Sequence, residues 1–455
     1  METALEKPYS VGTLHYTLGG VLAVCGWMLW GGFCYSMLAY VLVPTLLPLT
    51  LDSFHASGAL IGLVVGSIPA AMNFVMNPIL STTSDRTRTK WGRRIPYLAF
   101  ATPFVALFLI LLGWTPEAAA LHHPTQLPGD SPATLGFVLV CVFAVFFQFF
   151  NLIIGSIYYY IFADVIPHRF IGRFMAFLNL SFTAAGFVFN YFLMEYAREY
   201  SSWIYTGIGI LYAVSFALMC FFVKEGEYPP PPQYQAAMVP VAKRLVNWMG
   251  IYFRQCYRSP FYSMLFLGTA MTQVSTVCRS VFNLLFATRE LHLTEAQFGR
   301  IMGIGSLVSL GVILLMGYLM DKLHPLRVFL WSGVLVILIN VWGYFHVTDY
   351  ATFFAVGIVI VIVYSVQTLS SVPMYIALFP PEKYGQFSSA NAMVNSVLVI
   401  VANWGGGLAI DRFGYRFIFV WDFIFTVIAT AVLIYVYVKW KQLGGMNHYK
   451  APEVE

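Results

Sequence analysis

The stretch SDRTRTKWGRRIPY, residues 84–97, joins two long apolar runs. It places five cations within nine residues, and such loops are retained on the cytoplasmic side of a membrane. Residues 58–80 before it and 95–114 after it are each long enough to cross a bilayer core of about 30 Å. The stretch therefore predicts a membrane protein that crosses the bilayer repeatedly, and it indicates which side this loop occupies.

The composition of the whole chain agrees with this prediction. Of the 455 residues 59% are hydrophobic and only 10% are charged, whereas a soluble domain is about 25% charged. The six cysteines lie in or beside apolar runs without a Cys-x-x-Cys pair, which indicates packing residues rather than a disulfide framework or a metal site. We expect no cofactor, no metal and no nucleic-acid partner.

Twelve apolar runs extend along the chain, and the first shows no signal-peptide cleavage site. They lie near residues 18–43, 58–80, 95–114, 135–161, 171–194, 203–223, 261–287, 297–320, 327–346, 351–378, 386–408 and 415–438. With the N-terminus inside, 19 of the 25 Lys and Arg residues fall in inside segments and 5 in outside segments. This distribution predicts twelve spans with both termini cytoplasmic, in the inner or plasma membrane.

A polar, proline-bearing segment divides these spans six and six. We therefore expect an all-α membrane protein with an N-terminal bundle over residues 1–223, a cytoplasmic linker over 224–258 and a C-terminal bundle over 259–455. Residues 244–258 carry aromatic residues at helical spacing, which predicts a helix on the inner membrane surface. Short motifs recur at the ends of the fourth and tenth spans, as expected of parallel six-helix repeats around a mid-membrane solute site.

The loop at residues 84–97 has two interpretations. Topogenic charge alone would explain the cations, but Asp85 contributes little to topology. A carboxylate there can instead bind an Arg fork or the N-terminus of a neighbouring helix. Such contacts can hold the cytoplasmic ends of the two halves together in one conformation and release them in the other. We favour this gate, in which Gly92 permits the turn, and expect its members to be Asp85, Arg86, Gly92, Arg93, Arg94, Asp164, Arg173 and Asp321.

The same loop resembles that of the glycoside–pentoside–hexuronide symporters of the major facilitator superfamily, nearest the sucrose-transporter branch. There, too, Ser-Asp-Arg is followed by a short spacer, Gly-Arg-Arg and Pro. Other matching residues are Gly26, Trp27, Pro44, His55, Ala56, Asn151, Gly155, Ala163, Asp164, Gly406, Gly407, Asp411 and Gly414. The resemblance implies the twelve-helix facilitator fold and a sugar or glycoside, of the disaccharide type, as substrate.

The resemblance also implies ion coupling, but the acids that the family uses for it are absent. Residues 58–80 contain no Asp or Glu, and Gln148 lies where sucrose transporters have a proton-linked Asp on the fourth helix. The missing acids favour uncoupled facilitation, whereas the resemblance favours proton symport. We lean to symport.

Two ionised residues lie inside predicted spans, where each costs about 2.5–3.5 kcal/mol on insertion scales. Arg279 lies deep in the seventh span and Asp422 near the start of the twelfth. We expect Arg279 to be functional and Asp422 to be either its coupling partner or a hydrated residue near the outer surface. A static ion pair is the alternative for both.

Uncharged polar residues also recur in the spans. A single amide is most simply explained by hydrogen bonds between helices, but the ensemble favours a polar cavity in which amides bind sugar hydroxyls and aromatic rings face the sugar. The predicted substrate-binding residues are Trp27, Trp30, Asn73, Asn77, Gln148, Asn151, Gln273, Arg279, Asn283, Gln367, Asn391 and Asn395. Further aromatic candidates are Tyr35, Tyr158, Tyr159 and Trp404.

These observations predict a secondary transporter that works by alternating access, and not an enzyme. An enzyme would need a nucleophile–base set, a carboxylate pair or a metal cluster within the spans, and the sequence shows none. An uncoupled facilitator of a small polar solute is one alternative, and a transporter-like membrane sensor is another. We expect a monomer whose partners are the sugar, H⁺ and the lipid bilayer.

Overall fold

The structure is a computed structural model that describes residues 9–121, 132–228, 255–380 and 383–452. It is almost entirely helical, with one short hairpin of β1 (Tyr9–Val11) and β2 (Leu14–Tyr16) at its start. The chain divides into two compact units. Unit 1 comprises Met1–Pro232 with Leu293–Leu307, and unit 2 comprises Gln233–His292 with Val308–Glu455.

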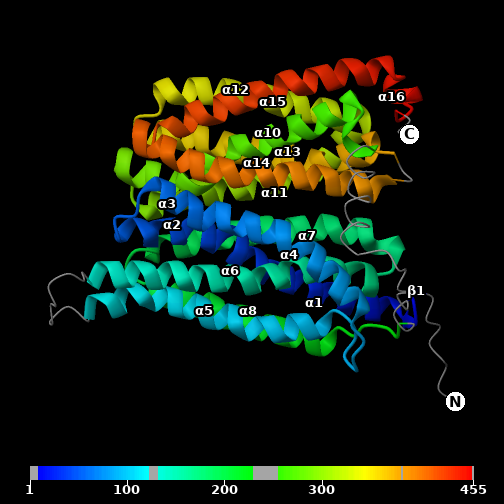
Figure 1. Cartoon of the computed structure of the whole chain (residues 1–455), viewed down its shortest axis with the longest axis horizontal. Coiled ribbons are helices and arrows are strands. Elements are labelled where there is room, and N and C mark those ends of the chain that lie inside the picture. The colour runs from blue at the N-terminus through cyan, green and yellow to red at the C-terminus, as the bar shows by residue number, and fades with distance from the viewer. Residues whose placement is uncertain (1–8, 122–131, 229–254, 381–382, 453–455) are drawn as a thin grey trace, which may run out of the picture. The chain divides into compact units, whose positions relative to one another are not determined.

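In unit 1 six helical spans follow the hairpin (Figure 1). The first three are α1 (Leu18–Ser36) with the π-turn η1 (Met37–Leu42) and α2 (Val43–Ser53); α3 (Gly58–Gly62) with η2 (Leu63–Ser67) and α4 (Ile68–Arg86); and α5 (Ile95–Leu121). The next three are α6 (Pro132–Val165); α7 (His168–Val188) with η3 (Phe189–Leu193) and η4 (Met194–Tyr196); and α8 (Ser201–Phe222).

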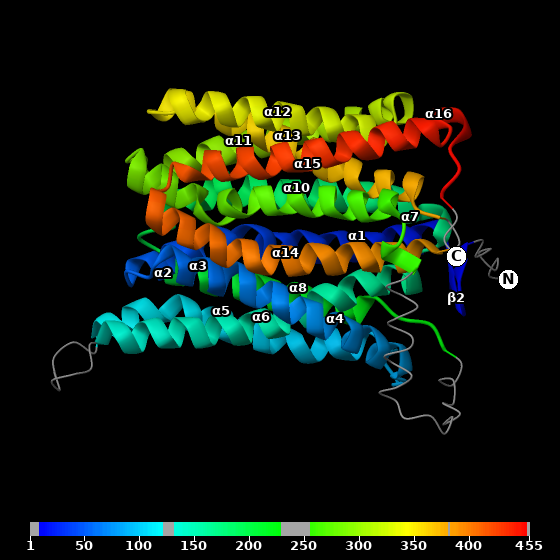
Figure 2. The same cartoon turned by 45° about the horizontal axis from the view of Figure 1, so that its top comes forward.

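Unit 2 holds five spans and most of a sixth, since α11 begins in unit 1 (Figure 2). They are α10 (Pro260–Leu285) with η5 (Phe286–Glu290), α11 (Glu295–Leu323), α12 (Pro325–His346), α13 (Tyr350–Leu378), α14 (Tyr384–Phe413) and α15 (Phe417–Gln442), followed by the short α16 (Gly445–His448).

These twelve spans of the described chain match the predicted order. Eleven are long and apolar enough to cross a membrane. The twelfth, α10, has sufficient length at 26 residues, but Thr, Ser and Gln side chains and Arg279 make it more polar. The first span is longer than predicted: it continues to Ser53, whereas the prediction ended near Val43. Pro44 and Pro48 lie in the added part, and each lacks the N–H that a residue inside a helix donates. A π-turn directly before Pro44 lets the helix continue.

Close helix contacts hold each unit together. In unit 1, α5 packs against α6 and α8, and α1 packs against α7 and α8. A Cβ at Gly113 of α5 would lie 2.5 Å from the Cβ of Tyr205 on α8, so only glycine permits this approach. In unit 2, α10 packs against α14 and α15, and Gly268 lies in the same way against Leu433. Small residues at such contacts are typical of helix packing in membranes.

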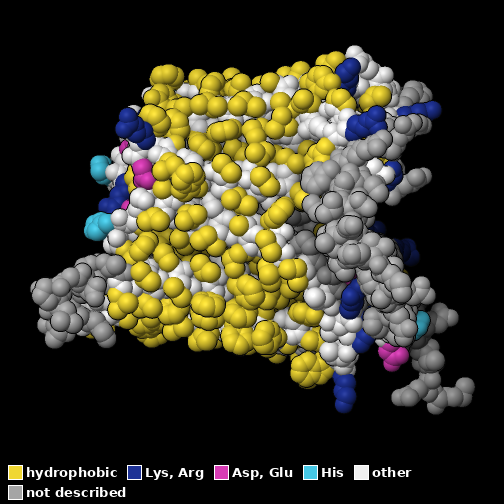
Figure 3. Space-filling view, in the orientation of Figure 1, with side chains coloured by type: hydrophobic (Ala, Val, Ile, Leu, Met, Phe, Trp, Pro, Cys, Tyr) yellow, Lys and Arg dark blue, Asp and Glu magenta, His cyan; other side chains and the backbone are white. Residues whose placement is uncertain are grey.

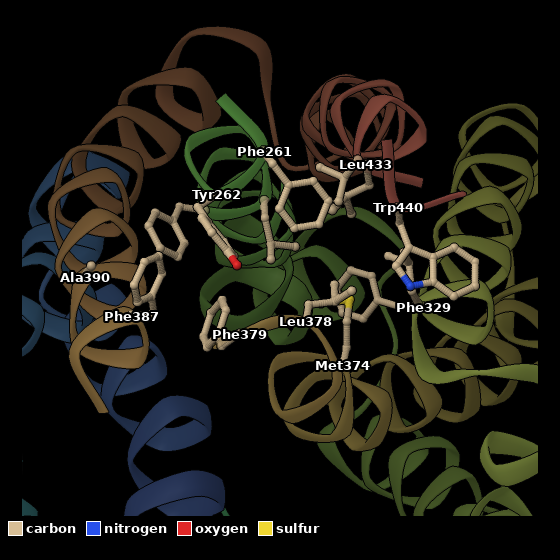
Figure 4. Close-up of a cluster of buried hydrophobic side chains, with 14 of the residues drawn as sticks. Phe261, Tyr262, Phe329, Met374, Leu378, Phe379, Phe387, Ala390, Leu433 and Trp440 are labelled. Carbon is tan, nitrogen blue, oxygen red and sulfur yellow. The ribbon is translucent and has the colours of Figure 1, made fainter. Parts of the chain in front are cut away.

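Unit 2 has a core of buried aromatic and aliphatic side chains at one end of its helices (Figure 4). Tyr262 and Phe266 of α10, Phe387 of α14 and Trp440 of α15 are almost completely buried there. Outside such cores, exposed hydrophobic side chains cover the middle of the helices, while charged side chains gather at helix ends (Figure 3). This distribution is that of an integral membrane protein that crosses the bilayer repeatedly.

The predicted domain boundaries at residues 223 and 259 remain a proposal. The predicted surface helix over residues 244–258 lies, up to residue 254, outside the described residues.

Candidate functional site

Four helix ends of unit 1 meet in a cluster of charges, which we call the basic-loop cluster: Asp85, Arg93, Arg94, Asp164 and Glu225. Asp85 ends α4, the two arginines precede α5, Asp164 ends α6 and Glu225 follows α8. The ends of the second, fourth and sixth spans and the start of the third therefore lie at one end of this unit. Alternating spans require this arrangement.

A closed ring of ion pairs joins three residues of the loop, Asp85, Arg93 and Arg94, to Asp164 of α6. Arg93 donates to Asp164 through two nitrogens, with Nε 3.0 Å from Oδ2. Arg94 bridges the two acids, with Nη2 2.5 Å from Asp85 Oδ1 and Nε 3.3 Å from Asp164 Oδ2, and it also donates to Ser84 Oγ. Each arginine thus contacts both carboxylates, since Arg93 Nη1 lies 3.8 Å from Asp85 Oδ1.

Burial and aromatic neighbours strengthen this ring. Asp164 and Arg94 are almost buried, and hydrogen bonds between ionised groups at such sites are stronger than those in water. Burial is the largest single influence on the pKa of Arg93 and lowers it. The hydrogen bond to Asp164 and the charges of Asp164, Tyr228 and Asp85 together outweigh burial and raise the pKa above its ordinary value. Arg93 also lies over the ring of Tyr228 at 4.2 Å from its centroid.

Glu225 caps the N-terminus of α5, the helix that follows Arg93 and Arg94. Its carboxylate accepts hydrogen bonds from the backbone N–H groups of Arg93, Arg94 and Ile95 at 2.7–2.9 Å. These are donors that the first turn of α5 leaves unpaired, and a carboxylate there also complements the positive end of the helix dipole. Tyr228 donates to the same carboxylate, and burial, aided by the charge of Glu225, raises the pKa of its phenol.

Gly92 makes this cap possible. Its φ is +108°, and an added Cβ would lie 2.6–2.7 Å from the side chain of Glu225. Replacing Gly92 with alanine should therefore strain the turn and displace the cap, at a cost of about 1–3 kcal/mol. We expect lower thermal stability and slower uptake for Gly92→Ala, measured in detergent and in proteoliposomes. Gly172→Ala is the matched control, because nothing lies near its Cβ position; equal effects in both variants would contradict this role.

Of the predicted gate residues, the structure brings Asp85, Gly92, Arg93, Arg94 and Asp164 together. Arg86 and Arg173 are exposed, and Arg173 lies outside the cluster. Asp321 lies within α11, near its end.

A second polar site lies inside unit 2, and we call it the Asp422 network: Arg279, Asn340, Tyr364, Asp422 and Thr426. It joins four helices, since these residues lie on α10, α12, α13 and α15. The Asp422 side chain is 0% exposed and that of Arg279 is 5% exposed. The hydrated position near the outer surface that the sequence allowed for Asp422 is therefore excluded.

The network satisfies both buried charges. Asp422 Oδ2 lies 3.3 Å from Arg279 Nε, and it accepts from Asn340 Nδ2 at 2.9 Å and from the Tyr364 hydroxyl. Thr426 donates to the other oxygen at 3.2 Å, and Arg279 Nη2 donates to Asn340 Oδ1 at 2.6 Å. A buried ion pair is stable only with such additional hydrogen bonds, and an ionisable group in a membrane span is by default a functional candidate.

The predicted substrate-binding residues of unit 1 have different surroundings. Trp27 stacks on Phe222 with ring centroids 4.7 Å apart, and the Trp30 indole donates to Ser215 Oγ at 3.0 Å, so both contact α8. Asn73 is exposed and accepts from Asn77 one turn later. Gln148 is half-buried, and the buried Asn151 has an Oδ1 atom without a hydrogen-bond partner in the described chain.

The predicted substrate-binding residues of unit 2 also differ in how far they are buried. Gln273 is exposed and Gln367 is buried, while Asn283 and Asn395 are half-buried. Asn391 is buried and accepts from Thr269 Oγ1 at 2.8 Å, which is the interhelical hydrogen bond that the alternative interpretation expects.

Sequence reasoning missed Glu225, Asn340 and Tyr364. Glu225 carried a weaker signal than Asp85, namely an acid next to Lys224 at the end of a span. Asn340 is an amide in the middle of the ninth predicted span and could have been included with the other amides. Tyr364 carried no such signal, because a tyrosine within a span has many roles.

Solved structures with the same architecture are transporters. A bacterial homologue of the human lysosomal transporter Spinster aligns over 96% of this chain and 98% of its own, with a TM-score of 0.65 and 13% identity. The nucleoside transporter NupG aligns over 93% of this chain and 100% of its own, with a TM-score of 0.63 and 13% identity. At this identity, the likeness establishes the fold and not the substrate.

Curated relatives are also transporters. The human membrane-associated transporter protein is 30% identical over 194 residues, which are 42% of this chain and 33% of that protein. The mouse protein of the same name is 28% identical over the same shares. The matched segment thus spans about a third of the length of these relatives.

A family model covers far more of the chain, from residue 28 to residue 435, and its description is MFS/sugar transport protein. This match decides the assignment: the chain belongs to the family described as MFS/sugar transport protein, in the major facilitator superfamily, whose proteins are membrane transporters and not enzymes.

Proposed function

We propose that this protein carries a sugar or glycoside, of the disaccharide type, across the membrane by alternating access, coupled to the symport of protons. The observation that carries the proposal is the Asp422 network. A carboxylate that is 0% exposed and accepts from an arginine, an amide and two hydroxyls can take up a proton from solution only when a conformational change opens the network. Such a group can link proton occupancy to transport.

The polar side chains of both units support a sugar as substrate. The exposed amides include Asn73, in the Gly58–Arg86 span, and Gln273, in α10. Side chains that face lipid are apolar. The two amides suit paired hydroxyl groups, and they carry no charge that would select an ionic substrate. The family assignment points to the same substrate class.

The basic-loop cluster supports a gate. Its ion pairs join α4, α5 and α6 at the end that the distribution of Lys and Arg assigns to the cytoplasm. Both termini are proposed to be cytoplasmic, the membrane to be the inner or plasma membrane, and the protein to act as a monomer. We propose that this ring, which lies within unit 1, opens or shifts as the transporter alternates, so that its strength tunes the rate.

The proposal is tested by uptake of labelled sucrose and maltose into proteoliposomes, with and without an inward proton gradient. We expect accumulation above equilibrium that a protonophore abolishes. Equilibration that ignores the gradient would instead establish an uncoupled facilitator. Absence of uptake for both sugars would contradict the substrate class.

A further inference from the structure

The π-turn η1 places an aromatic side chain in an unusual position. The N–H of Val43 donates to the carbonyl of Leu38, five residues earlier. In a regular α-helix, residues five apart point about 140° away from each other. Here the rings of Tyr35 and Tyr40 are in edge contact, with centroids 5.6 Å apart. Tyr35 is buried, whereas Tyr40 is 53% exposed. The π-turn therefore places Tyr40 next to Tyr35 but at the surface of the unit.

The surroundings of Tyr40 include polar side chains as well as the ring of Phe182. Tyr159 of α6, which is 38% exposed, lies near it. One turn earlier on the same face of α6, Ser156 donates to Asn77 Oδ1, and the Asn77 amide donates to Asn73 at 2.5 Å. These five residues, Tyr40, Asn73, Asn77, Ser156 and Tyr159, form what we call the Tyr40 face.

A different exposed face shows what lipid contact looks like in this unit. Phe100, Leu107 and Leu111 of α5 are all exposed, and their spacings of seven and four residues place them on one side of the helix. That side is apolar throughout these positions. The Tyr40 face instead exposes hydroxyl and amide groups, and Asn73 lies near the midpoint of the Gly58–Arg86 span. Polar groups at that depth face water rather than lipid.

From this arrangement we infer that the Tyr40 face is the part of unit 1 that binds the ring of a sugar substrate. The inference rests on the proposed function and specifies its site. The exposed ring of Tyr40 offers an apolar surface to the C–H groups of a pyranose or furanose, and its hydroxyl offers a polar edge. The amides of Asn73 and Asn77 offer both donors and acceptors for neighbouring sugar hydroxyls.

The existing hydrogen bonds preorganise these groups. Ser156 orients Asn77, and Asn77 orients Asn73. Side chains that are already held lose less conformational entropy when the sugar binds. Tyr40 and Ser156 therefore extend the predicted site, in which only the two asparagines of this face were included among the substrate-binding residues.

Transport kinetics separate this inference from the proposed function. With the sugar that the wild-type protein transports, Tyr40→Ala should raise KM about tenfold and Tyr40→Phe about threefold, since the latter loses a hydrogen bond but keeps the ring. Phe100→Ala is the control: this aromatic is 59% exposed on the apolar face of α5, and its KM should equal that of the wild type. Normal uptake by Tyr40→Ala would overturn the inference and leave the proposed function intact. A wild-type protein that transports no sugar would overturn both.

Thiol labelling tests the same face without relying on rates. In a background that lacks the six native cysteines, Tyr40→Cys should react with a membrane-impermeant methanethiosulfonate, and the transported sugar should slow the reaction. Phe100→Cys should remain unlabelled. If Tyr40→Cys is as unreactive as Phe100→Cys, or if the sugar gives no protection, the Tyr40 face is not the binding surface.

Discussion

Replacing Arg279 with methionine is expected to destabilise the folded protein by about 3–5 kcal/mol. Methionine removes the positive charge but leaves Asp422 completely buried, with its nearest cation gone. Asn340 would lose a partner as well, because Arg279 Nη2 donates to its oxygen. The measurement is the thermal unfolding of the purified protein in detergent, followed by the loss of the monodisperse peak on size-exclusion chromatography.

The double variant Arg279→Met/Asp422→Asn separates structure from coupling. Asparagine keeps an oxygen for Asn340 and Tyr364 to donate to but carries no charge, so stability should return to within about 1 kcal/mol of the wild type. If the pair couples protons to transport, this variant should equilibrate the sugar but not accumulate it under a proton gradient. Accumulation equal to that of the wild type would show that the pair is a static structural contact.

The second large effect is expected for Asp164→Ala. Arg93 would lose its bidentate partner and Arg94 one of its two acids, while Asp85 alone would face both cations. Because Asp164 is almost buried, the loss should cost about 3 kcal/mol. Uptake per folded molecule should fall about tenfold, which corresponds to about 1.4 kcal/mol in the barrier. Both quantities are measured on reconstituted protein.

An exposed ion pair in the same unit provides the control. Arg198 lies 3.9 Å from Glu295, but its side chain is 82% exposed, and such pairs contribute between zero and about 1 kcal/mol. Arg198→Ala should therefore change neither stability nor uptake measurably. If Asp164→Ala behaved like Arg198→Ala, the basic-loop cluster would be topogenic charge rather than a gate.

Much of the fold could be predicted from the chain because a bilayer imposes simple rules. A span must be helical and apolar for about 20 residues, and cations must remain on one side. These rules act on each segment separately, so the run at 415–438 and the loop at 84–97 could be recognised without knowledge of their neighbours. The predicted end of the first span, near Val43, was wrong by about ten residues, because the helix continues through Pro44 and Pro48.

The basic-loop cluster and the Asp422 network were less predictable, because they depend on which helices pack against each other. Arg279 and Asp422 attracted attention as charges in apolar surroundings, but the sequence left open whether Asp422 was hydrated. Only the packing of α10 against α15 shows that the two residues pair and are buried. In the same way, an acid such as Glu225 has no definite role until the end of α8 lies beside the start of α5.

By itself, therefore, the sequence determined the class of protein, the number and order of its spans and the motif at the loop of residues 84–97. Hydrophobicity and charge act locally along the chain, and they suffice for these features. The tertiary structure alone decided that Asp85, Arg93, Arg94 and Asp164 form a ring, that Asp422 has four partners and that a π-turn exposes Tyr40. Those features require directional contacts between residues that are up to 143 positions apart, and no local pattern encodes them.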